Sequence, residues 1–286
     1  MAIARFYSDG SLVQKMQSLI ADMSVKGIFI DICAIDARPI ALDYDPGTLD
    51  DYSKLGAPNV CLIAGRMLPV LSHPQFELGF ADVGAFLGSL CVRDAAECVA
   101  SIDIVNKPTG RKADANYPLR YDGASWTDAG CSVGGCSFAE MSDTQKNEMD
   151  DKHIIYAGQY FGYPGMYWSS SKTCTSDADD FCRIERNSAW NVAARGLVTA
   201  LTSKIKSKIP LNPDGTIRRT TITYWSGLAE QNLKAMKDSE LISDYKVYID
   251  PAQKVLSGVP ISVQLTIVPI GIADSITGTV GFSTSI

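Results

Sequence analysis

Few residues in this chain have the type and spacing that chemistry requires. Only two histidines occur, His73 and His153, and neither lies in a recognisable catalytic context. The phosphate-binding pattern GxxxxGKS or GxxxxGKT is absent, and no GxGxxG follows an apolar, strand-like run. Gly65-Arg66 follows one such run, and a plain turn explains it better than an anion contact. The inventory of catalytic side chains is therefore thin.

The eight cysteines do not form a metal-ligand pattern, because no CxxC pair occurs. Four fall in apolar strand-like or helix-like sequence, where free cysteine behaves as a small hydrophobe; they are Cys33, Cys61, Cys91 and Cys98. The other four form two loop pairs in which a disulfide is sterically plausible, Cys131 with Cys136 and Cys174 with Cys182. The first residues, MAIARFYSDG, lack the charged segment and apolar core of an export signal. We therefore expect all the thiols to be reduced.

Acidic residues gather in two places, at 143–151 and at 177–180. Calcium prefers oxygen-rich loops, and glycoside hydrolysis needs paired carboxylates. The run Asp177-Ala178-Asp179-Asp180 nevertheless has no EF-hand spacing and no closing glutamate. A helix start explains it, with Ser176 as the N-cap and the acids complementing the helix dipole. We predict no metal site, no cofactor and no catalytic residue, so the chain is not expected to be an enzyme.

The overall composition is that of a soluble globular protein. Hydrophobic residues make up 46% of the chain and charged residues 20%. A formal charge of -6 and a pI near 5.0 argue against nucleic-acid binding, which usually needs a basic face. No apolar run approaches the ~18–20 residues that span a membrane. We expect neither nucleic acid nor membrane insertion.

The first part of the chain alternates helical and strand-like patterns. Helical spacing covers 12–23, and the almost continuously apolar run 28–33 is typical of a parallel strand buried on both faces. A short helix at 48–55, a strand at 60–63 and a helix at 83–90 follow. This alternation predicts an α/β layer with a mainly parallel sheet. Because the chain opens on a helix where a strand should come first, we expect a preceding region to be missing.

The later part of the chain predicts a different arrangement. Residues 105–150 are rich in turn sequences and predict an irregular excursion that ends in a polar helix near 142–151. A long helix is expected from Asp177 to Lys208, stopped by Pro210, with a buried stripe of Trp190, Ala194, Leu197, Leu201 and Ile205. A second helix should bury Ile222, Trp225, Ala229, Leu233 and Met236. A strand around 245–249 follows.

The predicted fold is therefore α/β, or α+β overall. A mainly parallel α/β layer precedes a C-terminal domain of two long helices packed on a small mixed or antiparallel sheet. We place the first domain at residues 1–172 and the second at 173–286.

The C-terminal sequence shows strict alternation of apolar and polar residues, which predicts a strand that buries one face only. The apolar pattern resumes after Pro269 and Gly271. A one-face-apolar strand suits addition to an exposed sheet edge of a partner. The hypothesis is a subunit interface that contains Ile261, Val263, Leu265, Ile267, Ile276, Val280, Phe282 and Ile286.

Four stretches of sequence carry a resemblance to a known family. They are Leu55-Gly56-Ala57-Pro58-Asn59-Val60 and residues 83–102, 158–197 and 247–286. The third contains Gly162-Tyr163-Pro164-Gly165-Met166-Tyr167, and the fourth contains Tyr248-Ile249-Asp250-Pro251-Ala252-Gln253-Lys254. In this order, from about residue 50 to the end, they resemble phage tail sheath-like proteins.

The resemblance implies a structural subunit of a helical sheath that surrounds a tail tube and contracts to drive it through a cell envelope. The implied partners are further copies of the chain, the tail-tube protein, and baseplate and tail-terminator proteins. The implied location is the virion tail, or the host cytoplasm during assembly. It also implies that the C-terminal region packs close to the tube, with terminal arms that add strands to neighbouring subunits. An α/β enzyme and a non-phage surface or adhesion protein remain the alternatives.

Overall fold

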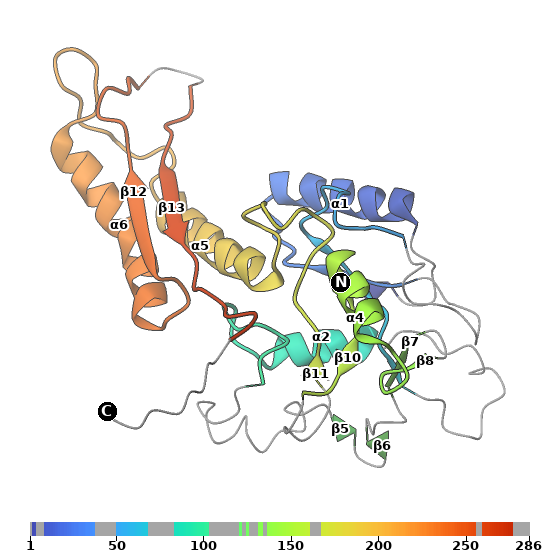
Figure 1. Ribbon diagram of the computed structural model, residues 1–286. Helices are drawn as coiled ribbons and strands as arrows, with labels where there is room; N and C mark the ends of the chain where they lie inside the picture. Colours follow the sequence, from blue (N-terminus) through green and yellow to red (C-terminus); the bar gives the residue numbers. More distant parts are fainter. Residues whose placement is uncertain are drawn as a thin grey trace, which may run out of the picture.

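The core of the first part of the chain is a four-stranded parallel sheet (Figure 1). The computed structural model describes residues 2–3, 9–37, 50–67, 83–102, 120–121, 124–125, 131–133, 136–160, 167–255 and 259–276. The strands run in the order β1 (Ala2–Ile3), β2 (Cys33–Asp36), β3 (Val60–Ile63) and β9 (Ile154–Ile155), and each pairs parallel with its neighbour. The predicted strand at 60–63 is confirmed.

Helices cover both faces of this sheet. On one face, α1 (Gly10–Val25) and α4 (Asp143–Asp151) contribute Val13, Ile20 and Met149 to a core that also holds Cys33 and Leu62. On the other face, α2 (Val83–Cys91) packs against the alternate residues of the same strands. Every residue of β2 and β3 is buried as a result. The mainly parallel α/β layer that the apolar runs predicted is confirmed.

Three expectations about the first sixty residues are wrong. The chain does not open on a helix, because β1 precedes α1 and pairs with β2. The strand predicted at 28–33 begins only at Cys33. Gly27, with a φ of +79°, ends α1, and the amide of Ile28 donates a hydrogen bond to the carbonyl of Met23. Residues 28–32 therefore form the connection between α1 and β2. Residues 50–55 form turns where the end of a short helix was expected.

The described residues of the predicted irregular excursion include short antiparallel strands. The three-stranded sheet β4-β7-β8 joins Arg66–Met67, Cys131–Val133 and Cys136–Ser137, and β5 (Arg120–Tyr121) pairs with β6 (Ala124–Ser125). The polar helix at the end is confirmed as α4, where Ser142 and Gln145 form a capping box. β10 (Ala157–Gly158) and β11 (Tyr167–Trp168) then pair antiparallel.

The acidic run before the long helix is not helical, contrary to expectation. Asp179 Oδ1 accepts a hydrogen bond from the amide of Phe181 at 2.8 Å, and Ser176 Oγ accepts from the amide of Ala178 at 3.3 Å. These local bonds hold residues 176–182 in turns, because short polar side chains compete with the helix for backbone amides. The helix α5 begins at Ile184, after Arg183 as N-cap, and ends at Thr202.

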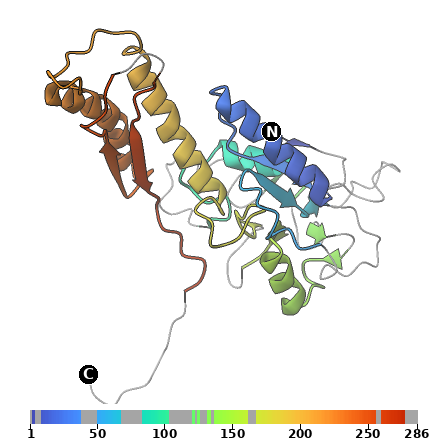
Figure 2. The same cartoon turned by 90° about the horizontal axis from the view of Figure 1, so that it is seen from above.

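The two long helices pack side by side, as predicted (Figure 2). Of the two, α5 also contacts the α/β layer. The predicted stripe on α6 (Arg219–Asp238) is confirmed in that Trp225, Ala229, Leu233 and Met236 are buried. The stripe predicted on α5 is wrong, since Trp190 is 39% exposed and Ile205 is 70% exposed. The buried residues of α5 are Ile184, Glu185, Asn187, Ala189, Asn191 and Ala193.

A two-stranded antiparallel sheet completes the C-terminal part. β12 (Asp244–Tyr248) pairs with β13 (Gln264–Val268), with Asp244 opposite Val268 and Tyr248 opposite Gln264. The sheet lies on α6, and α6 lies on α5 (Figure 1). The predicted architecture of two long helices on a small antiparallel sheet is confirmed. None of the helices described is long and apolar enough to cross a membrane.

Candidate assembly surface and its polar junction

The β12–β13 sheet has one covered face and one open face. Tyr245, Val247, Leu265 and Ile267 are half-buried against a cluster that contains Leu233 and Met236 of α6 and Ala189 and Ala193 of α5. The alternate residues of both strands are exposed. Among the described residues these strands pair only with each other, so each keeps one unpaired edge. Such an edge is a template for pairing with a further strand.

The residues predicted as a subunit interface fall into three groups. Ile261 and Val263 pack with Trp225 and Ile217, and Leu265 and Ile267 pack with α5 and α6, so these four side chains face their own subunit. Ile276 is 90% exposed. Val280, Phe282 and Ile286 lie outside the described residues. Of the five residues of this set that are described, Ile276 alone is exposed.

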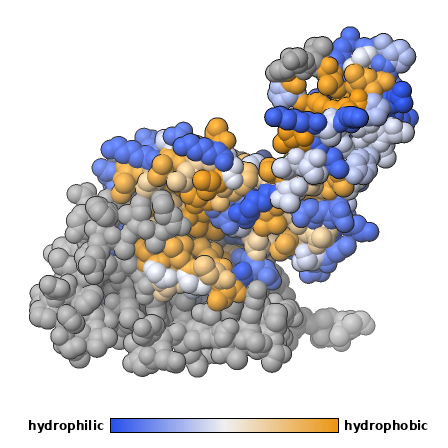
Figure 3. Space-filling model, turned by 180° about the vertical axis from the view of Figure 1, so that it is seen from behind, coloured by the Kyte–Doolittle hydropathy of each residue, from blue (hydrophilic) through white to orange (hydrophobic). Residues whose placement is uncertain are grey.

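Large apolar side chains are also exposed on residues 184–268, the unit that contains α5, α6 and the β12–β13 sheet. Seen from behind, apolar residues gather on parts of this unit as well as over the α/β layer (Figure 3). Scattered apolar residues are normal on a soluble protein, but gathered ones mark interaction sites. The open strand edges and these exposed side chains occur in the same part of the chain; the side chains are Val198, Ile205, Tyr224, Tyr248, Val259 and Val268.

Helix α5 is bound to the α/β layer through buried amides. Asn187 Nδ2 donates to the carbonyl oxygen of Pro58 at 2.7 Å, and Asn191 Nδ2 donates to Asp31 Oδ1 at 2.6 Å. Further along, Gly196 lies against Asn232 of α6. The first half of α5 therefore contacts both parts of the protein, since Asn187 and Asn191 bind the α/β layer while Ala189 and Ala193 pack against α6.

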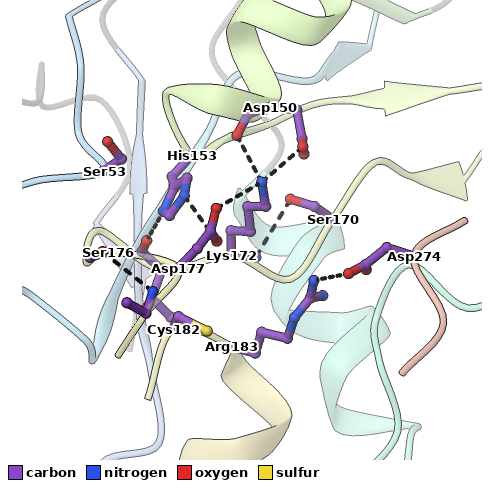
Figure 4. Close-up of polar contacts among 12 residues, drawn as sticks. Ser53, Asp150, His153, Ser170, Lys172, Ser176, Asp177, Cys182, Arg183 and Asp274 are labelled. Carbon is purple, nitrogen blue, oxygen red and sulfur yellow. Dashed lines mark hydrogen bonds and ion pairs between the residues drawn. The ribbon is translucent and has the colours of Figure 1, made fainter. Parts of the chain in front are cut away.

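A polar junction lies where the chain enters α5 (Figure 4). Lys172 Nζ contacts Asp150 Oδ2 at 2.8 Å and Asp177 Oδ2 at 3.7 Å. The imidazole of His153 lies between the carbonyl oxygen of Thr173, 2.7 Å from Nδ1, and Asp177 Oδ1, 3.3 Å from Nε2. The carboxylate of Asp177 thus contacts both the Lys172 ammonium and the His153 imidazole, which gives the acidic run a structural role in place of the predicted helix start.

The junction is not arranged for catalysis by its histidine or its thiol. Both ring nitrogens of His153 face oxygen acceptors, so neither is directed at a hydroxyl or thiol that it could deprotonate. Burial raises the pKa of the nearby Cys182 thiol, whereas a nucleophilic cysteine needs a lowered pKa. Among the described residues, no three His, Cys, Asp or Glu side chains gather as metal ligands.

Burial also makes the other core thiols poor nucleophiles. Burial raises the pKa of Cys33 to about 11 and raises the pKa of Cys61 and Cys174 above the usual range. Six cysteines are free in the structure, including the loop residues Cys174 and Cys182. The side chains of Cys131 and Cys136 lie outside the described set, so the state of all eight stays a prediction.

One ion pair of the junction was not predicted. Arg183 Nη2 donates to Asp274 Oδ2 at 2.6 Å and joins residues that are 91 positions apart. A signal exists in the sequence, because Asp274 is the only charged side chain after Lys254. It ties the segment after β13 to the start of α5.

Comparisons with known proteins place the fold. Residues 180–286 match the family described as DUF2586, C-terminal domain, a range that covers α5, α6, β12 and β13. A chain in the structure of the anti-feeding prophage baseplate is similar over 96% of this chain and 66% of its own length, with a TM-score of 0.59 and 12% identity. The chain shares that fold. No curated protein matches the sequence.

A second solved structure is similar over nearly the same range. It is the contracted sheath complex of an extracellular contractile injection system, PVC, which matches over 92% of this chain and 68% of its own, with a TM-score of 0.53 and 10% identity. The present chain thus spans about two thirds of the length of both chains. At these identities the likeness concerns the fold.

Proposed function

We propose that this chain is a structural subunit of a contractile tail sheath, in a phage or a phage-like injection system, and that it has no catalytic role. The observation that carries the proposal is the likeness of fold over nearly the whole chain to components of two contractile injection systems. The open edges of the β12–β13 sheet support it, because a sheath needs contacts that continue from one copy to the next.

The proposed mechanism of assembly is strand addition. A neighbouring copy would supply a strand to an edge of the β12–β13 sheet, and main-chain hydrogen bonds would join the subunits. A contact of this kind between different surfaces does not close on itself and generates a helical filament. Residues 173–286 form the sheath domain near the tail tube in this proposal, and residues 1–172 form the outer domain.

The partners in this proposal are other copies of the chain, the tail-tube protein, and the baseplate and tail-terminator proteins at the two ends. Contraction would require two packings of the same subunits, with the extended one trapped behind a barrier. The protein would reside in the host cytoplasm during assembly and in the particle tail afterwards.

Electron microscopy of the full chain co-expressed with the tube protein of the same particle tests the proposal. We expect striated sheaths around tubes, and we expect a variant that lacks residues 275–286 to fold with unchanged circular dichroism but to form no sheaths. This truncation keeps Asp274, so the junction at Arg183 is preserved. Bare tubes with the full chain present as a dispersed monomer would contradict the proposal.

A further inference from the structure

The segment that follows β13 is held against the start of α5 by few contacts. Residues 269–276 form no helix or strand. Ile270 and Ile272 are half-buried, whereas residues 273–276 are all exposed. At the near end, Ser243 Oγ donates to the carbonyl oxygen of Pro269 at 2.9 Å. At the far end stands the ion pair between Arg183 and Asp274.

The segment forms one wall of a hollow of ≈ 260 Å³, which has a largely polar lining. We call it the Arg183 socket; its fixed wall is formed by Lys172, Asp177, Cys182, Arg183 and Arg186. Its other wall is the segment itself, through Ile270, Ile272 and Asp274. Figure 4 shows the Asp274 carboxylate directed at the Arg183 guanidinium from a separate part of the chain.

The charges of the socket are unbalanced without the segment. Three cations and one carboxylate line the fixed wall, and Asp274 supplies the second carboxylate. Lys172 is already occupied by Asp150 and Asp177. The guanidinium of Arg186 contacts the sulfur of Cys182 at 3.6 Å. An acidic side chain is therefore the group that the socket accommodates best, and the free position is at Arg183.

The ion pair is stronger than an ordinary surface pair because its cation is withdrawn from water. The Arg183 side chain is only 11% exposed, whereas that of Asp274 is 65% exposed. Loss of the Asp274 carboxylate would leave this largely buried guanidinium without its ion-pair partner, which disfavours release. The buried Glu185 has an oxygen, Oε2, without a hydrogen-bond partner, and its charge interacts with that of Arg183.

We propose that the Arg183 socket is a docking site for the chain's own segment 270–274, which keeps this segment on its own subunit until a neighbouring copy binds it. The docking itself needs only the contacts seen here. Its significance for the timing of assembly rests on the proposed sheath function. Docking of segment 270–274 in the socket would limit strand pairing with wrong partners, which is a risk for any exposed strand-forming segment.

Thermolysin cleavage of the isolated full chain tests the docking, since this protease cuts before apolar residues such as Ile270, Ile272 and Ile276. With each fragment followed by mass spectrometry, we expect Asp274→Arg to raise the cleavage rate at these sites about tenfold, the factor for a pair worth ~1.4 kcal/mol. The double variant Arg183→Asp, Asp274→Arg should restore protection. Reversal of the exposed pair of Lys237 and Asp244, 2.8 Å apart, is the matched control and should leave the rate unchanged.

Two results would overturn the proposal. Equal cleavage of wild type and Asp274→Arg, confirmed with Asp274→Asn, would mean that the pair does not hold the segment. Protection that returns only when the Arg183→Asp and Asp274→Arg variants are mixed, and that depends on concentration, would mean that the segment docks on another copy. A failure of the wild type to form sheaths leaves the cleavage result intact, so the two proposals fail separately.

Discussion

Substitution of Gly196 by alanine should destabilise the protein although alanine is the better helix former. Gly196 lies in the interior of α5, where alanine normally gains about 0.5–1 kcal/mol over glycine. A Cβ at this position, however, would lie 1.9 Å from Asn232 Nδ2 and 2.3 Å from Asn232 Cγ on α6. Both distances are far below van der Waals contact, so the amide must move.

The magnitude follows from what has to give way. The obstacle is the end of a side chain and not backbone, and the Asn232 amide has only a weak contact, 3.7 Å from Met236 Sδ. Overpacking of this kind costs about 1–3 kcal/mol. Subtraction of the gain in helix propensity leaves about 0–2.5 kcal/mol, so we expect Gly196→Ala to lower the free energy of unfolding by about 1 kcal/mol.

Urea unfolding of a double-mutant cycle measures this coupling. In the background of Asn232→Ala the obstacle is gone, so the same alanine should stabilise by about 0.5–1 kcal/mol. Gly227→Ala on α6 is the matched control, because nothing lies within 4 Å of the added Cβ there, and it should stabilise in every background. If Gly196→Ala stabilises the wild type as much as Gly227→Ala does, the close contact between α5 and α6 is refuted.

Three further predictions concern the core, the buried carboxylate and the thiols. Phe86→Ala should lower the free energy of unfolding by about 3–5 kcal/mol, since Phe86 is fully buried and meets Trp168 edge to face at 5.1 Å; thermal unfolding that matches wild type would contradict this. Burial raises the pKa of Glu185 in the folded protein. The protonated side chain therefore stabilises the fold at pH values below the pKa of the unfolded chain, and this stabilisation is lost as pH rises through the folded-state pKa. Glu185→Gln should therefore gain stability relative to wild type from acid to neutral pH, whereas Asp244→Asn should lose it, because Lys237 lowers the pKa of Asp244. Thiol titration in denaturant without reductant should find all eight cysteines free, and a smaller number would indicate a disulfide.

The elements that the sequence predicted well are those whose apolar pattern fits only one kind of secondary structure. The run 60–63 could only be a buried strand, and the alternation through 261–267 does place Ile261, Val263, Leu265 and Ile267 on the inner face. The stripe on α6 was visible because one face of that helix is covered along its length.

The elements that were missed depend on contacts distant in sequence or on local side-chain bonds. The start of α5 was placed too early because the bonds of Ser176 and Asp179 to backbone amides are local alternatives to a helix. Its buried face was misjudged because polar Asn187 and Asn191 are buried to reach the α/β layer. The pairing of Arg183 with a carboxylate 91 positions away leaves no periodic signal.

Helix α5 is attached to both parts of the protein, so it can transmit a movement of one part to the other. Its 19 residues form a rod of about 28 Å at 1.5 Å per residue. The first half is fixed by Asn187 and Asn191, and the second by the contact of Gly196 with Asn232. If the rod stays straight, a tilt of about 20° at one end displaces the other by about 10 Å. A rotation of the α/β layer would then be carried by α5 to α6 and the small sheet that pack with it.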